Sequence, residues 1–207
     1  MVVAFDVVES MNLLEKYGIP VASFKIAENA DDAAAAAEGL GFPVVMKIIS
    51  EEHTHKTDVG GVIVGLKSRD EAVNAYNRLS KISSKVLVQK MVSGTEIIVG
   101  VKIDDVFGPA IMFGLGGIFV ELFKDVSFRL CPINADEAEE MILDTKASKI
   151  LYGFRGSKPL DVPAIKDILV KTSQLAANEN SLESLDINPV MVSENGAVAV
   201  DARILVK

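Results

Sequence analysis

The sequence predicts an α+β protein in which helices and β-strands follow one another along 207 residues. Three observations lead to this prediction. Apolar or alanine-rich segments with helical spacing alternate with short runs rich in β-branched residues, and glycine, proline or asparagine separates the two kinds of segment. Because 49% of its residues are apolar, the chain can bury a substantial core.

The first half of the chain is predicted to contain three helices and one buried strand. The helices are expected over 9–17, 31–39 and 68–80. The last of them begins at Ser68 with a glutamate three residues later, which is the pattern of a capping box. The buried strand is expected over 43–49.

A lysine interrupts this otherwise apolar strand. If the strand lies at the edge of a sheet, Lys47 can extend its ammonium group into solvent. If the strand is interior, Lys47 points a charge into a ligand site. The sequence pattern leaves both alternatives open.

The second half is predicted to begin with two strands, 86–91 and 97–103, and to end with two helices and a hairpin. Between the strand 97–103 and the two helices, Gly114, Gly116 and Gly117 precede a further strand. The glycines are expected either to free backbone N–H groups for an anion or to form a bulge. The later elements are expected over 136–149, 162–178, 185–192 and 197–200, the last two being joined by a Glu194-Asn195-Gly196 turn.

The bulk composition excludes several classes of function. No apolar run approaches the roughly 20 residues that span a bilayer, and the N-terminus lacks a signal pattern, so we expect a cytoplasmic protein with no membrane partner. The net charge of −8, without a basic cluster, argues against nucleic-acid binding. Cys131 is the single cysteine, so it cannot form an internal disulfide and is expected to be a buried structural thiol.

One of the two histidines lies in a loop suited to phosphate chemistry. His55 is followed by a lysine, a threonine, an aspartate and, after one more residue, by Gly60 and Gly61. A neutral imidazole can attack phosphorus, the lysine supplies positive charge, and the glycines let the backbone approach an anion. From these residues alone, a solvated loop or half of a metal site shared with His53 is an equal alternative.

Four stretches of the sequence, in order, resemble the ATP-grasp fold, and more closely the nucleotide-binding β subunit of ADP-forming acetyl-CoA synthetases (acetate–CoA ligases), which are related to succinyl-CoA synthetases. They are HKTDVGGV (55–62), FGPAIMFGLGGIFVELFKDVSFRL (107–130), LDINPV (185–190) and AVDARI (199–204). The resemblance covers essentially the whole chain. It implies a two-lobed α+β ATP-grasp fold with mixed or antiparallel sheets and flanking helices. The sequence pattern places the boundary near Lys85, between the third helix and the strand at Gln89, so the lobes are expected over 1–85 and 86–207.

The resemblance also implies a nucleotide site for ATP or ADP. Lys47 looks like the lysine that meets the α-phosphate, and its point charge suits that task. The strand end at Gln89 looks like the hinge between the lobes, where backbone groups of Lys90 and Met91 would read the adenine edge. Glu96 matches the carboxylate that accepts hydrogen bonds from the ribose hydroxyls.

Two further groups of residues complete the implied site. Gly116 and Gly117 would present backbone donors to phosphate. Asn188 and Asp201 match the pair that holds Mg²⁺ in this family, and oxygen ligands are what Mg²⁺ requires. An ordinary turn at Asn188-Pro189 is the alternative.

In the mechanism that the resemblance implies, His55 is the phosphohistidine of the β subunit. A separate CoA-binding α subunit makes an acyl phosphate, a histidine of that partner takes the phosphoryl group, and His55 carries it to ADP. The implied assembly is an α₂β₂ heterotetramer, and the overall reaction converts acyl-CoA, ADP and phosphate into acid, ATP and CoA.

One departure from the family pattern concerns the metal motif. Family members commonly carry glutamate at the position of Ser184, and Glu183 lies one position too early, on the opposite face of a strand. The roles of four charged residues in the other motifs stay open between phosphate contacts, subunit contacts and structural ion pairs: Glu121, Asp125, Arg129 and Arg155.

Two other functions fit the same fold. A nucleotide-sensing regulatory domain, as fused to some protein acetyltransferases, would bind nucleotide without turnover. An ATP-grasp ligase that activates a carboxylate directly would need neither His55 nor a partner. The intact His55 loop and Asp201 favour the synthetase subunit.

Overall fold

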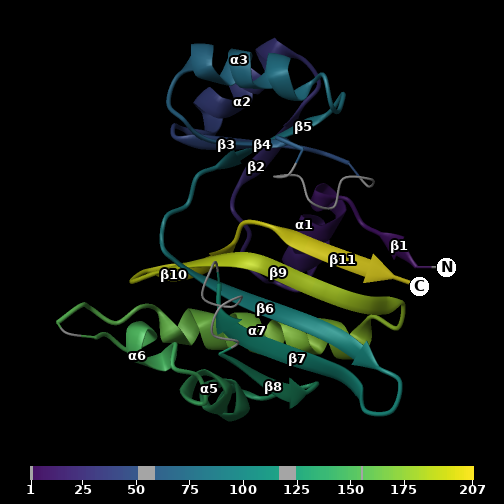
Figure 1. Cartoon of the computed structure of the whole chain (residues 1–207), viewed down its shortest axis with the longest axis vertical. Helices are drawn as coiled ribbons and strands as arrows, with labels where there is room; N and C mark the ends of the chain where they lie inside the picture. Colours follow the sequence, from purple (N-terminus) through teal and green to yellow (C-terminus); the bar gives the residue numbers. More distant parts are fainter. Residues whose placement is uncertain (1, 51–58, 117–124, 155) are drawn as a thin grey trace. The chain divides into compact units, whose positions relative to one another are not determined.

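The computed structural model describes residues 2–50, 59–116, 125–154 and 156–207. These residues form two compact units (Figure 1). The small unit consists of Asp6–Val8 and Ala22–Val92, and the large unit of Met1–Phe5, Glu9–Val21 and Ser93–Lys207. Within the described ranges, no helix combines the length and apolarity that crossing a membrane requires.

The small unit is a four-stranded antiparallel sheet covered on one face by two helices (Figure 1). In spatial order its strands are β2 (Phe24–Ala27), β5 (Val86–Lys90), β3 (Val44–Ile48) and β4 (Val62–Leu66). The helices are α2 (Ala30–Leu40) and α3 (Arg69–Leu79). Small residues of α2 allow close packing on the sheet, and they share a core with apolar residues of α3, β3 and β5, including Ala33, Ala37, Leu79, Met46 and Val88.

The large unit is built on a seven-stranded antiparallel sheet (Figure 1). The main path runs through β1 (Val3–Ala4), β11 (Ala202–Val206), β9 (Leu182–Ser193), β6 (Thr95–Asp104), β7 (Gly108–Leu115) and β8 (Val126–Leu130), and β10 (Gly196–Ala199) pairs with β9. Four helices accompany the sheet among the described residues: α1 (Val7–Lys16), α5 (Ala135–Leu143), α6 (Ser148–Leu151) and α7 (Val162–Asn178). Helix α7 packs along β6, β7 and β10.

Local signals explain why several elements match the sequence prediction. Helix α7 has the expected bounds because Asp161 accepts a hydrogen bond from the N–H of Ala164 and a proline occupies the first turn. Helix α3 is capped by Ser68, which accepts from the N–H of Glu71. The Glu194-Asn195-Gly196 turn joins β9 and β10 as an antiparallel hairpin, as expected.

Other elements differ from the sequence prediction. The single helix expected over 136–149 is two helices, because the chain turns at Thr145, whose side-chain hydroxyl and N–H both donate to the carbonyl of Ile142. Six strands were not predicted: β1, β2, β4, β7, β8 and β11. Gly114 lies inside β7 rather than ahead of a strand, and the strand expected after Gly117 falls outside the described residues.

The division into units also differs from the expected lobes. The units divide between Val92 and Ser93, whereas the sequence placed the boundary near Lys85. Strand β5 is hydrogen-bonded on both sides, to β2 and to β3, so it belongs to the small sheet. The segment Glu9–Val21 belongs to the large unit although it precedes the small unit in sequence.

Candidate functional site

Lys47 lies on an interior strand of the small unit. Strand β3 is bordered by β5 and β4, so the edge-strand alternative for this lysine is excluded. Its neighbours Met46 and Ile48 belong to the core shared with α2 and α3, so Lys47 lies on the opposite face of the sheet. The residue is only 6% exposed. With the edge-strand alternative excluded, the ligand-site alternative for Lys47 stays as the prediction.

The loop that carries His55 is anchored beside Lys47. Residues 51–58, including His53 and His55, lie outside the described residues. Beyond them, the carbonyl of Gly61 accepts a hydrogen bond of 2.9 Å from the N–H of Ile48, and Val62 is the register partner of Lys47. The connection between β3 and β4 therefore leaves and re-enters the sheet next to Lys47.

The end of β5 is hydrogen-bonded to two neighbouring segments. The backbone N–H of Lys90 donates to the carbonyl of Ser23 at 2.9 Å, and that of Met91 donates to the carbonyl of Pro43 at 3.1 Å. The buried Gln89 side chain donates to a backbone carbonyl of the segment before β2. Both N–H groups are thus engaged within the small unit, so an adenine contact at this position has to use other backbone groups of the same segment.

The side chain of Lys90 has a separate role. Its Nζ donates to the carbonyl oxygens of Gly41 and Phe42, at 2.6 and 3.3 Å. It therefore ties the end of β5 to the turn between α2 and β3, which leads directly to the strand that bears Lys47.

In the large unit, Glu96 and Gly116 lie side by side at one end of β6 and β7. The N–H of Gly116 donates to the carbonyl of Glu96 at 2.8 Å. That N–H, which the sequence assigned to phosphate, is already used in this structure. Gly117 lies outside the described residues.

The two residues predicted to hold a metal ion are brought together. Asn188 lies in β9 and Asp201 lies between β10 and β11, and the N–H of Asn188 donates to the carbonyl of Asp201 at 3.2 Å. The side chain of Asp201 accepts a hydrogen bond of 2.9 Å from the N–H of Ala202. Asn188 is exposed and Asp201 half-buried. This pair offers amide and carboxylate oxygens at adjacent positions, which fits Mg²⁺ because that ion takes few protein ligands and keeps several waters.

Sequence reasoning did not single out Asp186, which lies two residues before Asn188. Partial burial raises the pKa of the Asp186 carboxyl above its ordinary value, Arg203 opposite it lowers that pKa, and the nearby Asp201 raises it further. Three or more His, Cys, Asp or Glu side chains grouped as metal ligands do not occur among the described residues. Asp186 is therefore a third carboxylate or amide side chain near the Asn188–Asp201 pair. It could not be identified from the sequence, because its distinguishing property is its partial burial in the fold.

The position of Ser184 clarifies the departure from the family pattern. Ser184 is the register partner of Lys102 on β6. Its neighbour Glu183 instead forms an ion pair of 2.9 Å with Lys207. A glutamate at position 184 would thus face Lys102 across the two strands.

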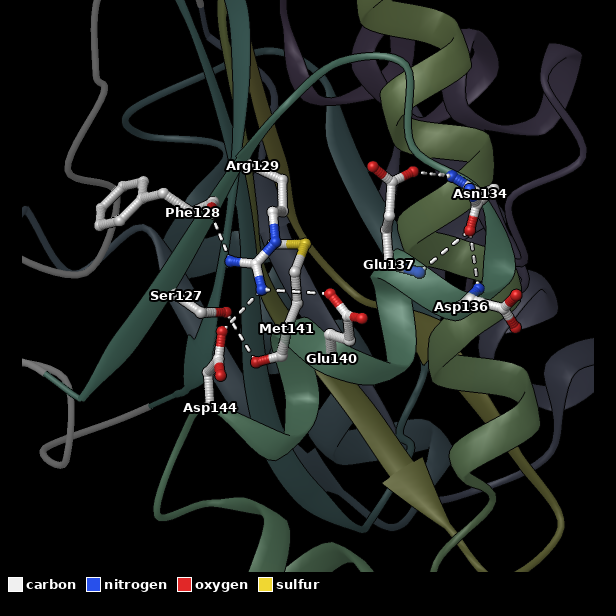
Figure 2. A network of polar contacts seen from close by, with 9 residues as sticks. All are labelled: Ser127, Phe128, Arg129, Asn134, Asp136, Glu137, Glu140, Met141 and Asp144. Atoms are coloured by element: carbon white, nitrogen blue, oxygen red, sulfur yellow. Dashed lines mark hydrogen bonds and ion pairs between the residues drawn. The ribbon is translucent and has the colours of Figure 1, made fainter.

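Arg129 forms structural ion pairs rather than a phosphate site. Figure 2 shows its guanidinium group between two carboxylates of the α5 region, at 2.7 Å from Asp144 and 3.7 Å from Glu140. On the same strand, Ser127 donates to the carbonyl of Met141. Both polar side chains of β8 are therefore bonded to α5 or to the residue that ends it.

The remaining charged residues and the cysteine have simpler positions. Asp125 accepts a hydrogen bond from the N–H of Ala147. Glu121 and Arg155 lie outside the described residues. Cys131 is half-buried rather than buried as predicted. Its partial burial raises the pKa of the thiol to about 11, so it carries little thiolate at neutral pH.

Nearly the whole chain matches one family of nucleotide-binding domains. A family model described as an ATP-grasp domain matches residues 3–206. Two antiparallel sheets with flanking helices agree with that match. The chain is thus an ATP-grasp protein, and the resemblance found in the sequence is confirmed.

Relatives define the subgroup more narrowly. The chain is 44% identical over 207 residues to the β subunit of acetate–CoA ligase (ADP-forming) I of Pyrococcus furiosus, covering 95% of this chain and 89% of that subunit. It is 46% identical over 206 residues to acetate–CoA ligase (ADP-forming) I of Archaeoglobus fulgidus, covering 95% of this chain but only 30% of that longer protein. The chain belongs to the family of the β subunits of ADP-forming acetate–CoA ligases.

Solved structures agree with this assignment. The dinucleotide-forming acetyl-coenzyme A synthetase 1 of Ca. Korarchaeum cryptofilum, in complex with coenzyme A, Ca-AMPCP and HgCl⁺, is 40% identical with a TM-score of 0.94, covering 99% of this chain and 94% of that one. Another structure of that synthetase, with coenzyme A and Mg-AMPPCP, has its phosphohistidine segment pointing towards the nucleotide-binding site. It is 40% identical with a TM-score of 0.89, covering 99% of this chain and 93% of that one.

Proposed function

We propose that this chain is the nucleotide-binding β subunit of an ADP-forming acyl-CoA synthetase and that His55 carries the phosphoryl group. The reaction is acyl-CoA + ADP + phosphate to acid + ATP + CoA, and it is reversible. The observation that carries the proposal is the buried, interior Lys47 beside the anchored ends of the His55 loop. A charge in this position is suited to the phosphates of a nucleotide.

The small unit contributes the nucleophile and part of the nucleotide site. His55 forms a P–N bond to the phosphoryl group as the P–N bond to the phosphorylated histidine of the α subunit breaks. The bond to His55 then breaks as an oxygen of the ADP β-phosphate forms the new P–O bond of ATP. Lys47 meets the α-phosphate, and the segment Gln89–Met91 lies along the adenine. The hydrogen bonds from Lys90 Nζ to the turn before β3 support the position of Lys47.

The large unit contributes the ribose and metal contacts. Glu96 accepts hydrogen bonds from the ribose hydroxyls. Asn188 and Asp201 hold Mg²⁺, which when bound neutralises charge on the nucleotide and on the transferring phosphoryl group. The backbone hydrogen bond between Asn188 and Asp201 supports this pairing, because it keeps the two residues adjacent before any ion arrives.

The acyl chemistry is assigned to a partner by the family resemblance. The chain spans 30% of the longer ligase of A. fulgidus and 89% of the P. furiosus β subunit. On the model of that β subunit, we assign the CoA site and the acyl phosphate step to a CoA-binding α subunit, in an α₂β₂ assembly in the cytoplasm.

ATP formation with the α subunit tests the proposal. The wild-type chain, His55→Asn and His53→Asn are each combined with the α subunit, acetyl-CoA, ADP, phosphate and Mg²⁺. We expect ATP formation to be lost in His55→Asn and retained in His53→Asn. Unchanged ATP formation in His55→Asn would refute the phosphohistidine, and would favour a ligase that activates its carboxylate directly. Absence of ATP formation in the wild-type assembly with a competent α subunit would instead favour a nucleotide-sensing domain.

A further inference from the structure

We infer that Gly116 is a positioning residue for Glu96 and that it thereby sets the selectivity of this chain for a ribonucleotide. The inference rests on the proposed contact between Glu96 and the ribose. It assigns Gly116 a role other than the phosphate donor that the family resemblance implies.

The first observation is how closely Gly116 approaches Glu96. Besides the hydrogen bond of 2.8 Å between the Gly116 N–H and the Glu96 carbonyl, a Cβ atom at position 116 would lie 3.0 Å from Glu96 Cβ and 3.1 Å from its carbonyl carbon. Gly116 is buried. A larger residue here would make unusually close contacts, so the backbone and the first side-chain atom of Glu96 would have to give by a few tenths of an ångström.

The second observation lies on the other side of the same strand end. A Cβ atom at Gly94, two residues before Glu96, would overlap the carbonyl oxygen of Val192 and lie 2.9 Å from its carbon. Val192 is the register partner of Thr95, and Met191 that of Glu96. Gly94 thus allows the beginning of β6 to approach β9 closely, and Gly116 allows the end of β7 to approach Glu96. The backbone of Glu96 is fixed from both sides.

This arrangement matters because Glu96 has a demanding geometric task. A carboxylate that accepts from the two neighbouring hydroxyls of a ribose needs both of its oxygens placed within a few tenths of an ångström. The backbone of Glu96 determines where its side chain starts. An added methyl group at Gly116 is expected to displace Glu96 by that amount and so to weaken the ribose contact selectively.

The chain offers a matched control two residues earlier on β7. A Cβ atom at Gly114 would lie 2.9 Å from the carbonyl oxygen of Asp125 and 2.9 Å from Val126 Cγ1, on the β8 side of the strand. Gly114→Ala therefore introduces a comparable steric conflict that the structure does not direct at Glu96. This variant shows how crowding of β7 away from Glu96 affects nucleotide affinity.

The experiment measures dissociation constants of the full chain for Mg-ADP and Mg-2′-deoxyADP by calorimetry, in wild type, Gly116→Ala, Gly114→Ala and Glu96→Gln. We expect the wild type to prefer ADP, and Glu96→Gln to lose about tenfold or more of that preference, the loss expected for a hydrogen bond to a charged group. Gly116→Ala should lose several-fold of the preference, whereas Gly114→Ala should keep it.

The outcomes separate the inference from the function beneath it. If Glu96→Gln loses the preference but Gly116→Ala keeps it, the inference is wrong and the proposed ribose contact stands. If Glu96→Gln also keeps the preference, the ribose contact itself is refuted, and the inference with it.

A second variant covers the case in which Gly116→Ala does not fold. Replacing Glu96 by glycine removes one of the contacts that the new methyl group would make, although the contact with the carbonyl carbon at position 96 is kept. The substitution Gly116→Ala should therefore reduce the folded fraction, measured by circular dichroism in urea, less in a Glu96→Gly background than in the wild type. An equal reduction in both backgrounds would show that the Glu96 side chain is not crowded and would overturn the inference.

Discussion

The backbone N–H of Asn188 donates a hydrogen bond of 3.2 Å to the carbonyl oxygen of Asp201, joining β9 to the turn that precedes β11. The whole of β10 lies between these residues in sequence, yet the strand pairing holds them as neighbours. Two oxygen-bearing side chains are thereby held at neighbouring positions, one on a strand and one in the turn that leads into the paired strand. Metal binding at this pair should accordingly depend on both side chains.

The first prediction concerns this pair. Asp201→Asn should weaken Mg²⁺-dependent nucleotide binding on the order of tenfold or more, because an anionic ligand becomes neutral. A titration of Mg²⁺ at fixed ADP measures the effect. Asp167→Asn removes the same charge at a surface ion pair with Lys171 and should leave the titration unchanged. Equal behaviour of the two variants would argue against a metal role for Asp201.

The second prediction concerns Asp186 and pH. Because burial raises the pKa of its carboxyl, the folded chain holds this proton more tightly than the unfolded chain does. Its contribution to stability is therefore present below the ordinary carboxyl pKa and is lost as pH rises through the raised value. Asp186→Asn should be more stable than wild type at pH 7, and the difference should vanish as pH falls to about 4.

Urea unfolding of both chains at several pH values measures this difference. A constant difference between wild type and Asp186→Asn across the range would mean that the carboxylate is not penalised by burial.

The third prediction concerns the position where family members carry glutamate. Ser184→Glu should increase the free energy of unfolding by about 0.2–1 kcal/mol through a cross-strand pair with Lys102, and should not change affinity for Mg²⁺. Repeating the substitution in a Lys102→Met background should remove the gain. A tighter Mg²⁺ titration in Ser184→Glu would show instead that a carboxylate here reaches the metal.

The fourth prediction concerns Arg129, whose role the sequence left open. Arg129→Met should lower the free energy of unfolding by about 1 kcal/mol, since it removes hydrogen-bonded ion pairs that join β8 to α5. Nucleotide affinity should stay at the wild-type value. Lys158→Met, which removes an ion pair in which the lysine is more exposed, should have a smaller effect on unfolding. Loss of nucleotide affinity without loss of stability would restore the phosphate role for Arg129.

Much of the fold could be predicted from local sequence signals, but several elements were not predicted. Helix α7 was predictable to the residue because its cap and its first-turn proline are local. The break between α5 and α6 was not predicted, although its signal is also local, since the hydroxyl and N–H of Thr145 both donate to the carbonyl of Ile142. Strand β4 begins with the β-branched run Val62-Ile63-Val64, which favours a strand, but Gly65 at φ +74° interrupts this short pattern.

The candidate site likewise contains residues that could be predicted from the sequence and contacts that could not. Lys47 was identifiable as a charge in an apolar strand, but only the sheet order showed that the strand is interior. Asn188 and Asp201 came from a family motif, and their adjacency came from strand register. The engagement of the N–H groups of Lys90 and Gly116 could not be predicted, because each depends on a carbonyl distant in sequence.

The most direct test of phosphoryl transfer is to locate the phosphoryl group itself. The purified chain is incubated with Mg²⁺ and γ-labelled ATP, alone and with the α subunit, and acid-labile, alkali-stable label is compared in wild type, His55→Asn and His53→Asn. Label on the wild type and on His53→Asn, with none on His55→Asn, is the predicted result. Label that persists on the chain of His55→Asn would contradict the central claim.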